Sequence, residues 1–339
     1  MSDAASTFVI AEAGVNHNGS LDMAIELVEA ARRCGADAVK FQTFKADSLV
    51  TRQAAKAAYQ QQSTSDSDTQ YAMLKALELG DDDFVRIHAH CRSLGIEFLS
   101  SAFDAASAEF LDGLGMRLFK IPSGEITNWP LLARIGGFGK PVILSTGMCH
   151  LADIEAALQR LESAGAGELT VLHCVTEYPA PFEQINLSAM HTLATAFGVR
   201  VGYSDHTAGI EIPIAAVAMG ATVIEKHFTL DTRLAGPDHA ASLAPDDFQR
   251  MVAAIRHVES ARGDGRKRPA PCERANLGIV RKSIIAQRPI AEGEVITLAH
   301  LALKRPGSGL APSQLEAVVG RRAARMIAID ELLDWGDLA

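Results

Sequence analysis

The chain has 339 residues, 48% of them hydrophobic and 22% charged, so it can bury a large core and is long enough for a barrel with a small appended domain. Its net charge is −9, which argues against general binding to nucleic acids or to anionic membranes. The five cysteines show no paired spacing, and we find neither a signal peptide nor an apolar run of about 18 residues, so we expect a reduced, cytoplasmic protein without a membrane segment.

Short apolar runs alternate with amphipathic segments along roughly the first 260 residues. We expect the runs to be strands at residues 8–14, 37–43, 97–104, 118–125, 141–147, 169–178, 199–207 and 223–229. Between them lie segments with apolar residues at helical spacing, for example residues 20–36, 82–95 and 151–165. Near-continuous apolar strands that alternate with helices are typical of a parallel sheet covered on both faces. Eight such units predict an α/β fold of the (β/α)8 TIM-barrel type. The loop GVNHNGS lacks the G-x-G-x-x-G motif that would favour an open sheet.

The sequence changes character after the last expected barrel helix, at residues 246–263. Residues 264–278 are rich in Gly, Pro and charge, which predicts a linker. Residues 279–339 contain short strand-like pieces separated by turns and predict a small β-rich domain. We therefore expect a catalytic barrel over residues 1–263, a linker, and a C-terminal domain that is too small to bury much core by itself.

Polar side chains stand near the ends of nearly all the expected strands. The carboxyl ends of barrel strands form the active site of TIM-barrel enzymes. Burying charge is unfavourable unless each group is paired or bound, so a whole rim of such residues indicates a site, although any one of them could be structural. The rim consists of Glu12, Lys40, Gln42, Ser101, Lys120, Ser123, Glu125, Ser145, Tyr178, Ser204, His206, Glu225 and His227.

Two histidines of this rim are candidates for a metal site. Alternation along a strand places Ser204 with His206 on one face of the seventh strand and Glu225 with His227 on one face of the eighth. Because these strands are neighbours, the imidazoles can approach each other and hold a first-row divalent ion that water and substrate complete. Two unrelated histidines are the alternative. Lys226 alternates with these residues, so we expect it to point outward into a salt bridge.

Lys40 and Lys120 are expected to face one cavity, at the ends of the second and fourth strands. Two ammonium groups repel each other unless an anion lies between them or they pair with Glu12 or Glu125. With the serine hydroxyls of the same rim, a phosphate or carboxylate is a suitable ligand. The residues themselves thus predict a barrel enzyme with a metal and an anionic, phosphorylated substrate, and they leave the reaction open.

Motifs spread over about residues 8–333 resemble those of the sialic acid synthase family. In chain order they are AEAGVNHNGSLDMA, ADAVKFQTFKA, KIPSGEITNWPLL, PVILSTGM, TEYPAPFEQINL, VGYSDHTAGIEI, VIEKHFTLD, GPDHAASL and KRPGSGL. The resemblance implies condensation of phosphoenolpyruvate with an N-acetylated amino-sugar aldehyde to a nine-carbon 2-keto acid. It also implies that the C-terminal domain is an antifreeze-like (SAF) domain, a name that refers to fold and not to ice binding.

Within this family the chain resembles the legionaminate branch most, on the run Ile126-Thr127-Asn128 and on His239. That resemblance implies 2,4-diacetamido-2,4,6-trideoxy-D-mannose as the sugar and N,N'-diacetyllegionaminate as the product. The alternative is an N-acetylneuraminate synthase that uses N-acetylmannosamine. Thr176 occupies a place where neuraminate synthases often have an amide, which argues against that substrate.

The resemblance also implies a role for each rim residue. His206 and His227 would hold a divalent ion, usually manganese, with magnesium or cobalt as alternatives, and the ion would polarise the aldehyde. Glu12 would stabilise positive charge at carbon 2 of phosphoenolpyruvate or activate water, and Lys40 and Lys120 complete the catalytic set. The phosphoenolpyruvate site would comprise Lys40, Gln42, Ser101, Lys120, Ser123, Ser145 and Ser204. The sugar site would comprise Glu125, Tyr178, Asp238 and Arg305.

Arg305 would reach the sugar from the C-terminal domain of a second subunit, which implies a homodimer with exchanged domains. The third strand departs from the family pattern, because Ser101 and Ala102 replace a Thr-Pro pair. Ser101 keeps the hydroxyl for anion binding, whereas the stiffness that proline gives to the loop is lost.

Two other classes of function are compatible with a barrel. A Schiff-base aldolase would use Lys120 or Lys226 as nucleophile, would be trapped by borohydride and would need no metal. A non-catalytic sugar-acid binding protein would leave the polar rim of the barrel without a purpose.

Overall fold

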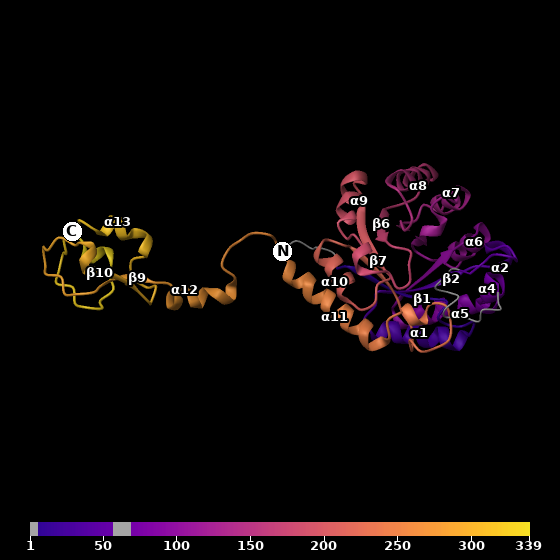
Figure 1. The fold of residues 1–339 in the computed structure, drawn as a ribbon, viewed down its shortest axis with the longest axis horizontal. Coiled ribbons are helices and arrows are strands. Elements are labelled where there is room, and N and C mark those ends of the chain that lie inside the picture. The colour runs from indigo at the N-terminus through magenta and orange to yellow at the C-terminus, as the bar shows by residue number, and fades with distance from the viewer. Residues whose placement is uncertain (1–5, 57–68) are drawn as a thin grey trace. The chain divides into compact units, whose positions relative to one another are not determined.

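The computed structural model describes residues 6–56 and 69–339, which fall into two compact units, Met1–Asp264 and Gly265–Ala339 (Figure 1). The segment 264–278, which we expected to be a linker, contains a 3-10 turn at Pro271–Glu273 and the first residues of helix α12 (Arg274–Val280). In the described ranges, no helix is both long enough and apolar enough to cross a bilayer.

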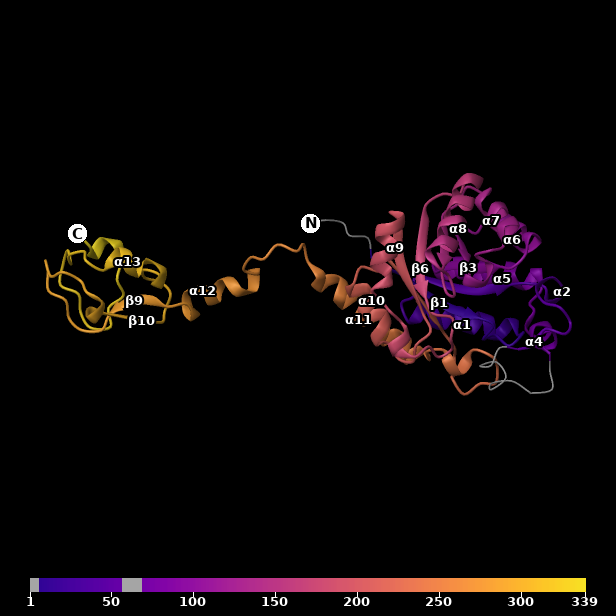
Figure 2. The ribbon, with the colours of Figure 1, turned by 45° about the horizontal axis from the view of Figure 1, so that its top comes forward.

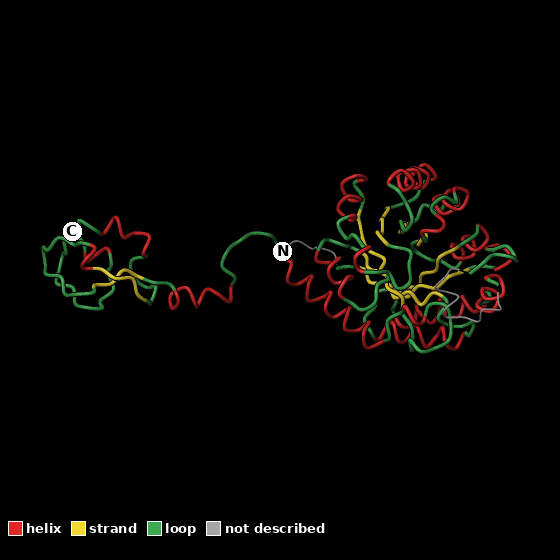
Figure 3. The backbone as a smooth tube through the Cα atoms, in the orientation of Figure 1, coloured by secondary structure: helices red, strands yellow, loops and turns green. Residues whose placement is uncertain are grey.

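The first unit is built on a sheet of eight parallel strands in the order β3-β2-β1-β8-β7-β6-β5-β4. β1 pairs with both β2 and β8, and β3 approaches β4, so the sheet closes into the predicted TIM barrel. Figure 3 shows these strands inside a ring of helices. The strands are β1 (Phe8–Gly14), β2 (Ala38–Thr43), β3 (Glu97–Ala102), β4 (Phe119–Ile121), β5 (Val142–Ser145), β6 (Leu169–Cys174), β7 (Arg200–Asp205) and β8 (Val223–His227).

Helices alternate with these strands and cover the barrel (Figure 2). Several ends follow local rules: the Ser20 hydroxyl accepts from the Met23 amide at the start of α1, and Gly95 ends α5 with a φ of 66°. The helices are α1 (Leu21–Arg33), α2 (Ala46–Leu49), α4 (Gln70–Leu77), α5 (Asp81–Leu94), α6 (Ala105–Gly113), α7 (Trp129–Gly136), α8 (Leu151–Ala164), α9 (Ala189–Phe197), α10 (Glu211–Ala218) and α11 (Pro245–Arg262).

The barrel strands are buried on both faces, which explains why the apolar runs are nearly continuous. Their apolar residues belong to one large core with the inner faces of the helices. The exceptions gather toward the carboxyl ends of the strands, where Glu12, Lys40, Lys120 and Glu225 are each less than 5% exposed. Buried charges require compensating partners, so these residues indicate a functional site at this end of the barrel.

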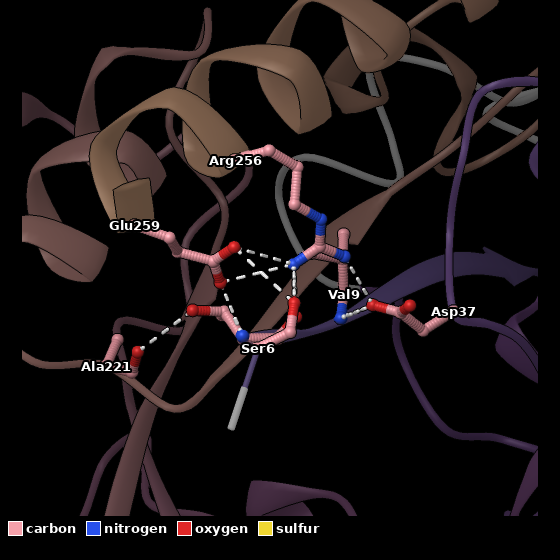
Figure 4. A network of polar contacts seen from close by, with 7 residues as sticks. Ser6, Val9, Asp37, Ala221, Arg256 and Glu259 are labelled. Carbon is pink, nitrogen blue, oxygen red and sulfur yellow. Dashed lines mark hydrogen bonds and ion pairs between the residues drawn. The ribbon is translucent and has the colours of Figure 1, made fainter. Parts of the chain in front are cut away.

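A polar network joins the first strand to the last barrel helix (Figure 4). The guanidinium of Arg256, on α11, donates to the Thr7 carbonyl and to Asp37 Oδ2, each at 2.8 Å. Asp37 Oδ2 also accepts from the Val9 amide at 2.8 Å, and Glu259 accepts from the Thr7 amide. The network therefore ties the beginning of the barrel to its end.

The second unit has a hydrophobic core of its own, which includes Ile284, Ile290, Val318 and Leu333. Its two regular strands, β9 (Ser283–Ala286) and β10 (Leu301–Lys304), pair in antiparallel fashion. Short turns and the single-turn helix α13 (Leu315–Val318) complete it. This arrangement agrees with the small β-rich domain expected from the sequence.

Candidate active site

A cavity opens at the carboxyl ends of the barrel strands, and most of the predicted rim lines it. The polar lining residues are Glu12, Lys40, Gln42, Ser101, Lys120, Ser123, Ser145, Thr176, Tyr178, Ser204, His206, Glu225, His227 and Asp238. Of the residues predicted for the site, only Glu125 and Arg305 are not among those that line this cavity. Glu125 lies at the end of a 3-10 turn and accepts from Asn128 Nδ2 at 2.7 Å. Arg305 belongs to the second unit, where its Nε donates to the Val280 carbonyl at 2.9 Å.

Two lysines and two glutamates form a buried charge cluster on the floor of the cavity. Lys40 Nζ lies 2.7 Å from Glu12 Oε2 and 3.8 Å from Glu225 Oε1, and Lys120 Nζ lies 3.3 Å from the same Glu225 oxygen. Each lysine is therefore paired with a carboxylate, which is one of the two arrangements that the sequence left open. One partner is Glu12, as expected, but the other is Glu225 and not Glu125. Glu225 reaches Lys120 across the barrel, because β8 and β4 are four places apart in either direction around the ring.

The cluster is balanced so that it can become positive. Burial raises the pKa of Glu12 to about 7, although Lys40 opposes this, whereas the two lysines overcome burial and lower the pKa of Glu225. Burial alone would lower the pKa of Lys40, but Glu12 and Glu225 raise it. Burial lowers the pKa of Lys120. When Glu12 takes up a proton, the two ammonium groups face a single carboxylate, and the floor of the cavity attracts an anion.

Hydroxyl groups of neighbouring strands add hydrogen-bonding capacity around the lysines. Lys40 Nζ donates to Ser101 Oγ at 3.4 Å, and Ser204 Oγ donates to Glu225 Oε1 at 3.3 Å. Ser123 Oγ accepts from the Gly147 amide at 2.8 Å. Ser145 Oγ is buried without a hydrogen-bond partner among the residues that the structure describes. An orphaned hydroxyl that lines the same cavity as two lysines is suited to a phosphate or carboxylate oxygen.

His206 and His227 come together as predicted, with ring centroids 5.5 Å apart. His206 Nδ1 lies 2.6 Å from the Val175 carbonyl oxygen, so Nδ1 carries the proton and the Nε2 lone pair is available. Burial lowers the pKa of both rings, and that of His227 most strongly, which keeps the imidazoles neutral. The Tyr178 ring packs against His206 at 4.1 Å.

The histidine pair meets the requirements of an open metal site only in part. His227 Nδ1 is buried and has no hydrogen-bond partner in the described residues, and its nearest charged neighbour, Asp238 Oδ2, is 3.9 Å away. Neutral imidazoles with an orphaned ring nitrogen suit a divalent ion. No group of three metal-ligating side chains occurs in the described part of the chain. The residues therefore fit an ion that substrate and water would complete, and not a closed structural site.

Lys226 points away from the cavity, as alternation predicts. Its Nζ lies 2.5 Å from Asp205 Oδ2 and also donates to the Thr207 carbonyl, and both charged side chains are 0% exposed. Asp205 Oδ1 accepts in addition from the Thr207 amide at 3.1 Å. A lysine in so complete a hydrogen-bonded ion pair is a structural residue and not a nucleophile.

The fold and the lining together define a TIM-barrel protein with a cavity at its carboxyl rim that is lined by lysines, hydroxyl groups and histidines. The chain belongs to the NeuB family, whose model matches residues 27–267, and residues 281–339 match the SAF domain.

Two relatives and one solved structure show how far this similarity extends. An N,N'-diacetyllegionaminic acid synthase of Legionella pneumophila is 48% identical over 97% of this chain and 93% of its own length. Another of the same name from Campylobacter jejuni is 47% identical over 96% of this chain and 98% of its length. The N-acetylneuraminic acid synthetase of Leptospira borgpetersenii, solved in complex with citrate, is 32% identical with a TM-score of 0.71, over 80% of this chain and 90% of that one.

Proposed function

We propose that the protein condenses phosphoenolpyruvate with 2,4-diacetamido-2,4,6-trideoxy-D-mannose and releases N,N'-diacetyllegionaminate and phosphate. One observation carries the proposal: a buried pair of lysines and a pair of neutral histidines share one rim in a chain 48% identical to a legionaminic acid synthase. Similarity to the N-acetylneuraminic acid synthetase is much lower, at 32%.

Phosphoenolpyruvate would bind on the floor of the cavity through its phosphate and carboxylate. Lys40 and Lys120 supply the charge, and Gln42 with the hydroxyls of Ser101, Ser123, Ser145 and Ser204 supplies donors. The anion competes with Glu12 and Glu225 for the lysines.

The reaction would form one carbon–carbon bond, add the oxygen of water to carbon 2 and break the bond between carbon 2 and the phosphate oxygen. Carbon 3 of phosphoenolpyruvate attacks the sugar aldehyde carbon, and the carbonyl oxygen becomes an alkoxide that takes up a proton. Carbon 2 is left with positive charge, to which water adds with loss of a proton. Collapse of the resulting adduct expels phosphate and leaves the 2-keto group.

Glu12 is suited to the second half of this sequence. Its carboxylate lies beside Lys40 on the floor of the cavity, where carbon 2 would stand, and Gln42 Nε2 donates to its Oε1 at 3.1 Å. The ionised form would stabilise the cation at carbon 2 or accept the proton of the incoming water. Both roles require deprotonation, which a pKa of about 7 permits near neutral pH.

His206 and His227 would hold a divalent ion, for which we propose manganese, with magnesium and cobalt as alternatives. When bound, such an ion supplies Lewis-acid polarisation of the aldehyde carbonyl. Tyr178, Asp238 and Glu125 would bind the remainder of the sugar. Burial raises the pKa of Asp238 to about 6, so that it can accept or donate a hydrogen bond near neutral pH.

We further propose that the protein is a homodimer in which Arg305 of one copy completes the cavity of the other. Coexpression of Glu12→Gln with Arg305→Ala tests this directly, because each single variant is expected to be inactive. In a mixed dimer with exchanged domains, the intact barrel receives an intact Arg305 and activity returns. No recovery in a purified mixed dimer would contradict the exchange.

Phosphate release from phosphoenolpyruvate tests the reaction itself. The purified protein is stripped with a chelator, supplied again with Mn²⁺, and assayed in parallel with the trideoxy sugar and with N-acetylmannosamine. We expect metal-dependent turnover that is much faster with the trideoxy sugar. Preference for N-acetylmannosamine would make the protein a neuraminate synthase, and turnover that chelation does not affect would remove the metal role of the histidines.

A Schiff-base aldolase is the rival reaction. Lys226 is unsuited to it because it lies in a buried ion pair, which leaves Lys120 as the candidate nucleophile. Borohydride treatment in the presence of substrate, followed by intact-mass measurement, should leave the protein unmodified. A covalent adduct at Lys120 would favour the aldolase over the condensation.

A further inference from the structure

The cavity has two chemically different sides. Charged and hydroxyl groups cover its floor and the side formed by β6 to β8, where Tyr178, His206 and His227 lie. A second group of lining residues is apolar and consists of five side chains that follow β1, β2 and β3 in the chain. We call these residues the apolar wall: Val15, Met73, Leu74, Leu77 and Phe103.

The apolar wall is a built part of the first unit and not a chance exposure. Its residues belong to a hydrophobic cluster, together with Phe44 and Leu49, that is distinct from the barrel core. Met73 and Leu74 share one face of α4 with Leu77, which follows them by four and three residues. Met73 and Leu77 are only 8% and 7% exposed.

Two contacts hold α4 in place over the cavity. Gly19, in the loop after β1, lies so close to α4 that any Cβ there would overlap the Ala76 carbonyl oxygen, and its φ of 73° also favours glycine. The hydroxyl of Tyr71 donates to Asp47 Oδ1 at 2.8 Å and so links α4 to α2. The wall therefore has a defined position relative to the reacting groups.

The chemistry of the wall restricts what can lie against it. None of its five side chains offers a hydroxyl, amide or charged group to a ligand. A hydroxyl or amide pressed against them would lose its water without gaining a partner, whereas a methyl group would gain contact. The aldehyde end of the sugar must reach the lysines and histidines, so the end remote from the aldehyde is the part left to meet the apolar residues.

We propose that the apolar wall makes the protein selective for a 6-deoxy sugar, by receiving a methyl group where other hexoses carry a hydroxymethyl group. The inference rests on the proposed function, because it requires an open-chain amino-sugar in the cavity. It assigns Met73 and Leu74 as specificity-determining residues.

Two sugars that differ by a single oxygen atom test the inference. These are 2,4-diacetamido-2,4,6-trideoxymannose and its 6-hydroxy counterpart, 2,4-diacetamido-2,4-dideoxymannose, each assayed by phosphate release with saturating phosphoenolpyruvate. Since an apolar pocket rejects an added hydroxyl only moderately, we expect kcat/KM to favour the 6-deoxy sugar by about 10- to 100-fold. Leu74→Asn and Met73→Gln should reduce this ratio to about threefold or less, mainly through KM for the sugars, with KM for phosphoenolpyruvate unchanged.

Leu49→Asn is the matched control, because Leu49 belongs to the same hydrophobic cluster but does not line the cavity. It should lower stability and keep the sugar preference. Equal use of both sugars by the wild-type protein, or a preference that both wall variants retain, would overturn the inference and leave the proposed reaction intact. Absence of phosphate release with either sugar would overturn the proposed reaction, and this inference with it.

Discussion

Replacement of Lys226 by methionine should destabilise the protein strongly, although Lys226 does not line the cavity. The ammonium is 2.5 Å from Asp205 Oδ2 and also donates to the Thr207 carbonyl, and neither charged side chain is exposed. Lys226→Met keeps the aliphatic volume but leaves the Asp205 carboxylate buried without a counter-charge. Loss of one partner of such a pair costs about 3–5 kcal/mol.

Chemical and thermal unfolding measure this cost. At roughly 2–4 °C per kcal/mol for a domain of this size, we expect the Tm of the barrel to fall by roughly 6 °C or more. The control is the double variant Lys226→Met with Asp205→Asn, in which the amide carbonyl can still accept from the Thr207 amide and no net charge is buried. It should regain at least half of the loss. A cost of less than about 1 kcal/mol for the single variant would refute the reasoning, because the carboxylate would then have another source of compensation.

The same ion pair should also affect the histidines. Asp205 and Thr207 flank His206 along the chain, and Lys226 precedes His227. If the pair helps to position the two imidazoles, its loss should weaken the proposed metal site by about 10- to 100-fold, as loss of outer-shell residues typically does. We expect Mn²⁺ binding, followed by electron paramagnetic resonance without substrates, to weaken by that amount in Lys226→Met and to recover partly in the double variant. Unchanged affinity in a folded Lys226→Met protein would limit the ion pair to a role in stability.

Three further predictions concern the floor of the cavity and the closure of the barrel. Burial raises the pKa of Glu12 to about 7, and its proposed roles need the carboxylate, so kcat/KM should rise with pH through about 7. Glu12→Gln should remove this pH dependence and lower the rate by at least about 100-fold. The Gly147 amide donates to Ser123 Oγ of the proposed phosphoenolpyruvate site, and an alanine Cβ at Gly147 would overlap Thr176 Oγ1. Gly147→Ala should therefore raise KM for phosphoenolpyruvate in initial-rate kinetics, and Thr176→Ala in the same chain should restore part of the affinity. Arg256→Ala should cost about 1 kcal/mol in urea unfolding, a value discounted because Asp37 is 38% exposed, and Arg256→Lys should retain part of this.

The barrel could be predicted from the sequence because each strand is buried on both faces. The resulting apolar runs, such as Leu169–Cys174, are separated by helices with clear ends, and eight of them in about 260 residues favour a closed parallel sheet over an open one. Alternation along each strand then placed His206 and His227 on the inside and Lys226 on the outside, as the structure has them. These predictions depend on spacing within single strands.

Helix α4 and its apolar wall were not predicted to belong to the site. The segment Gln70–Leu77 has only a short apolar stripe, which a sequence cannot distinguish from an ordinary helix that packs on the core. Its place over the cavity depends on the approach of Gly19 to the Ala76 carbonyl, a contact between residues that are far apart in the chain. Nothing in the spacing of either segment indicates this contact.

The partner of Lys120 was also missed, and here a signal was available. Glu12 and Glu125 were the carboxylates expected to pair with the two lysines, but Glu125 follows β4 in a turn and accepts a hydrogen bond from Asn128. Side chains inside a TIM barrel stack in layers, and each layer is contributed by alternate strands. Lys40, Lys120 and Glu225 come from β2, β4 and β8, so the layer rule predicts that these three long side chains converge near the barrel axis, where their charges must be balanced within the layer. The rule favours Glu225, which lies within a barrel strand, over Glu125, which lies in the turn after β4.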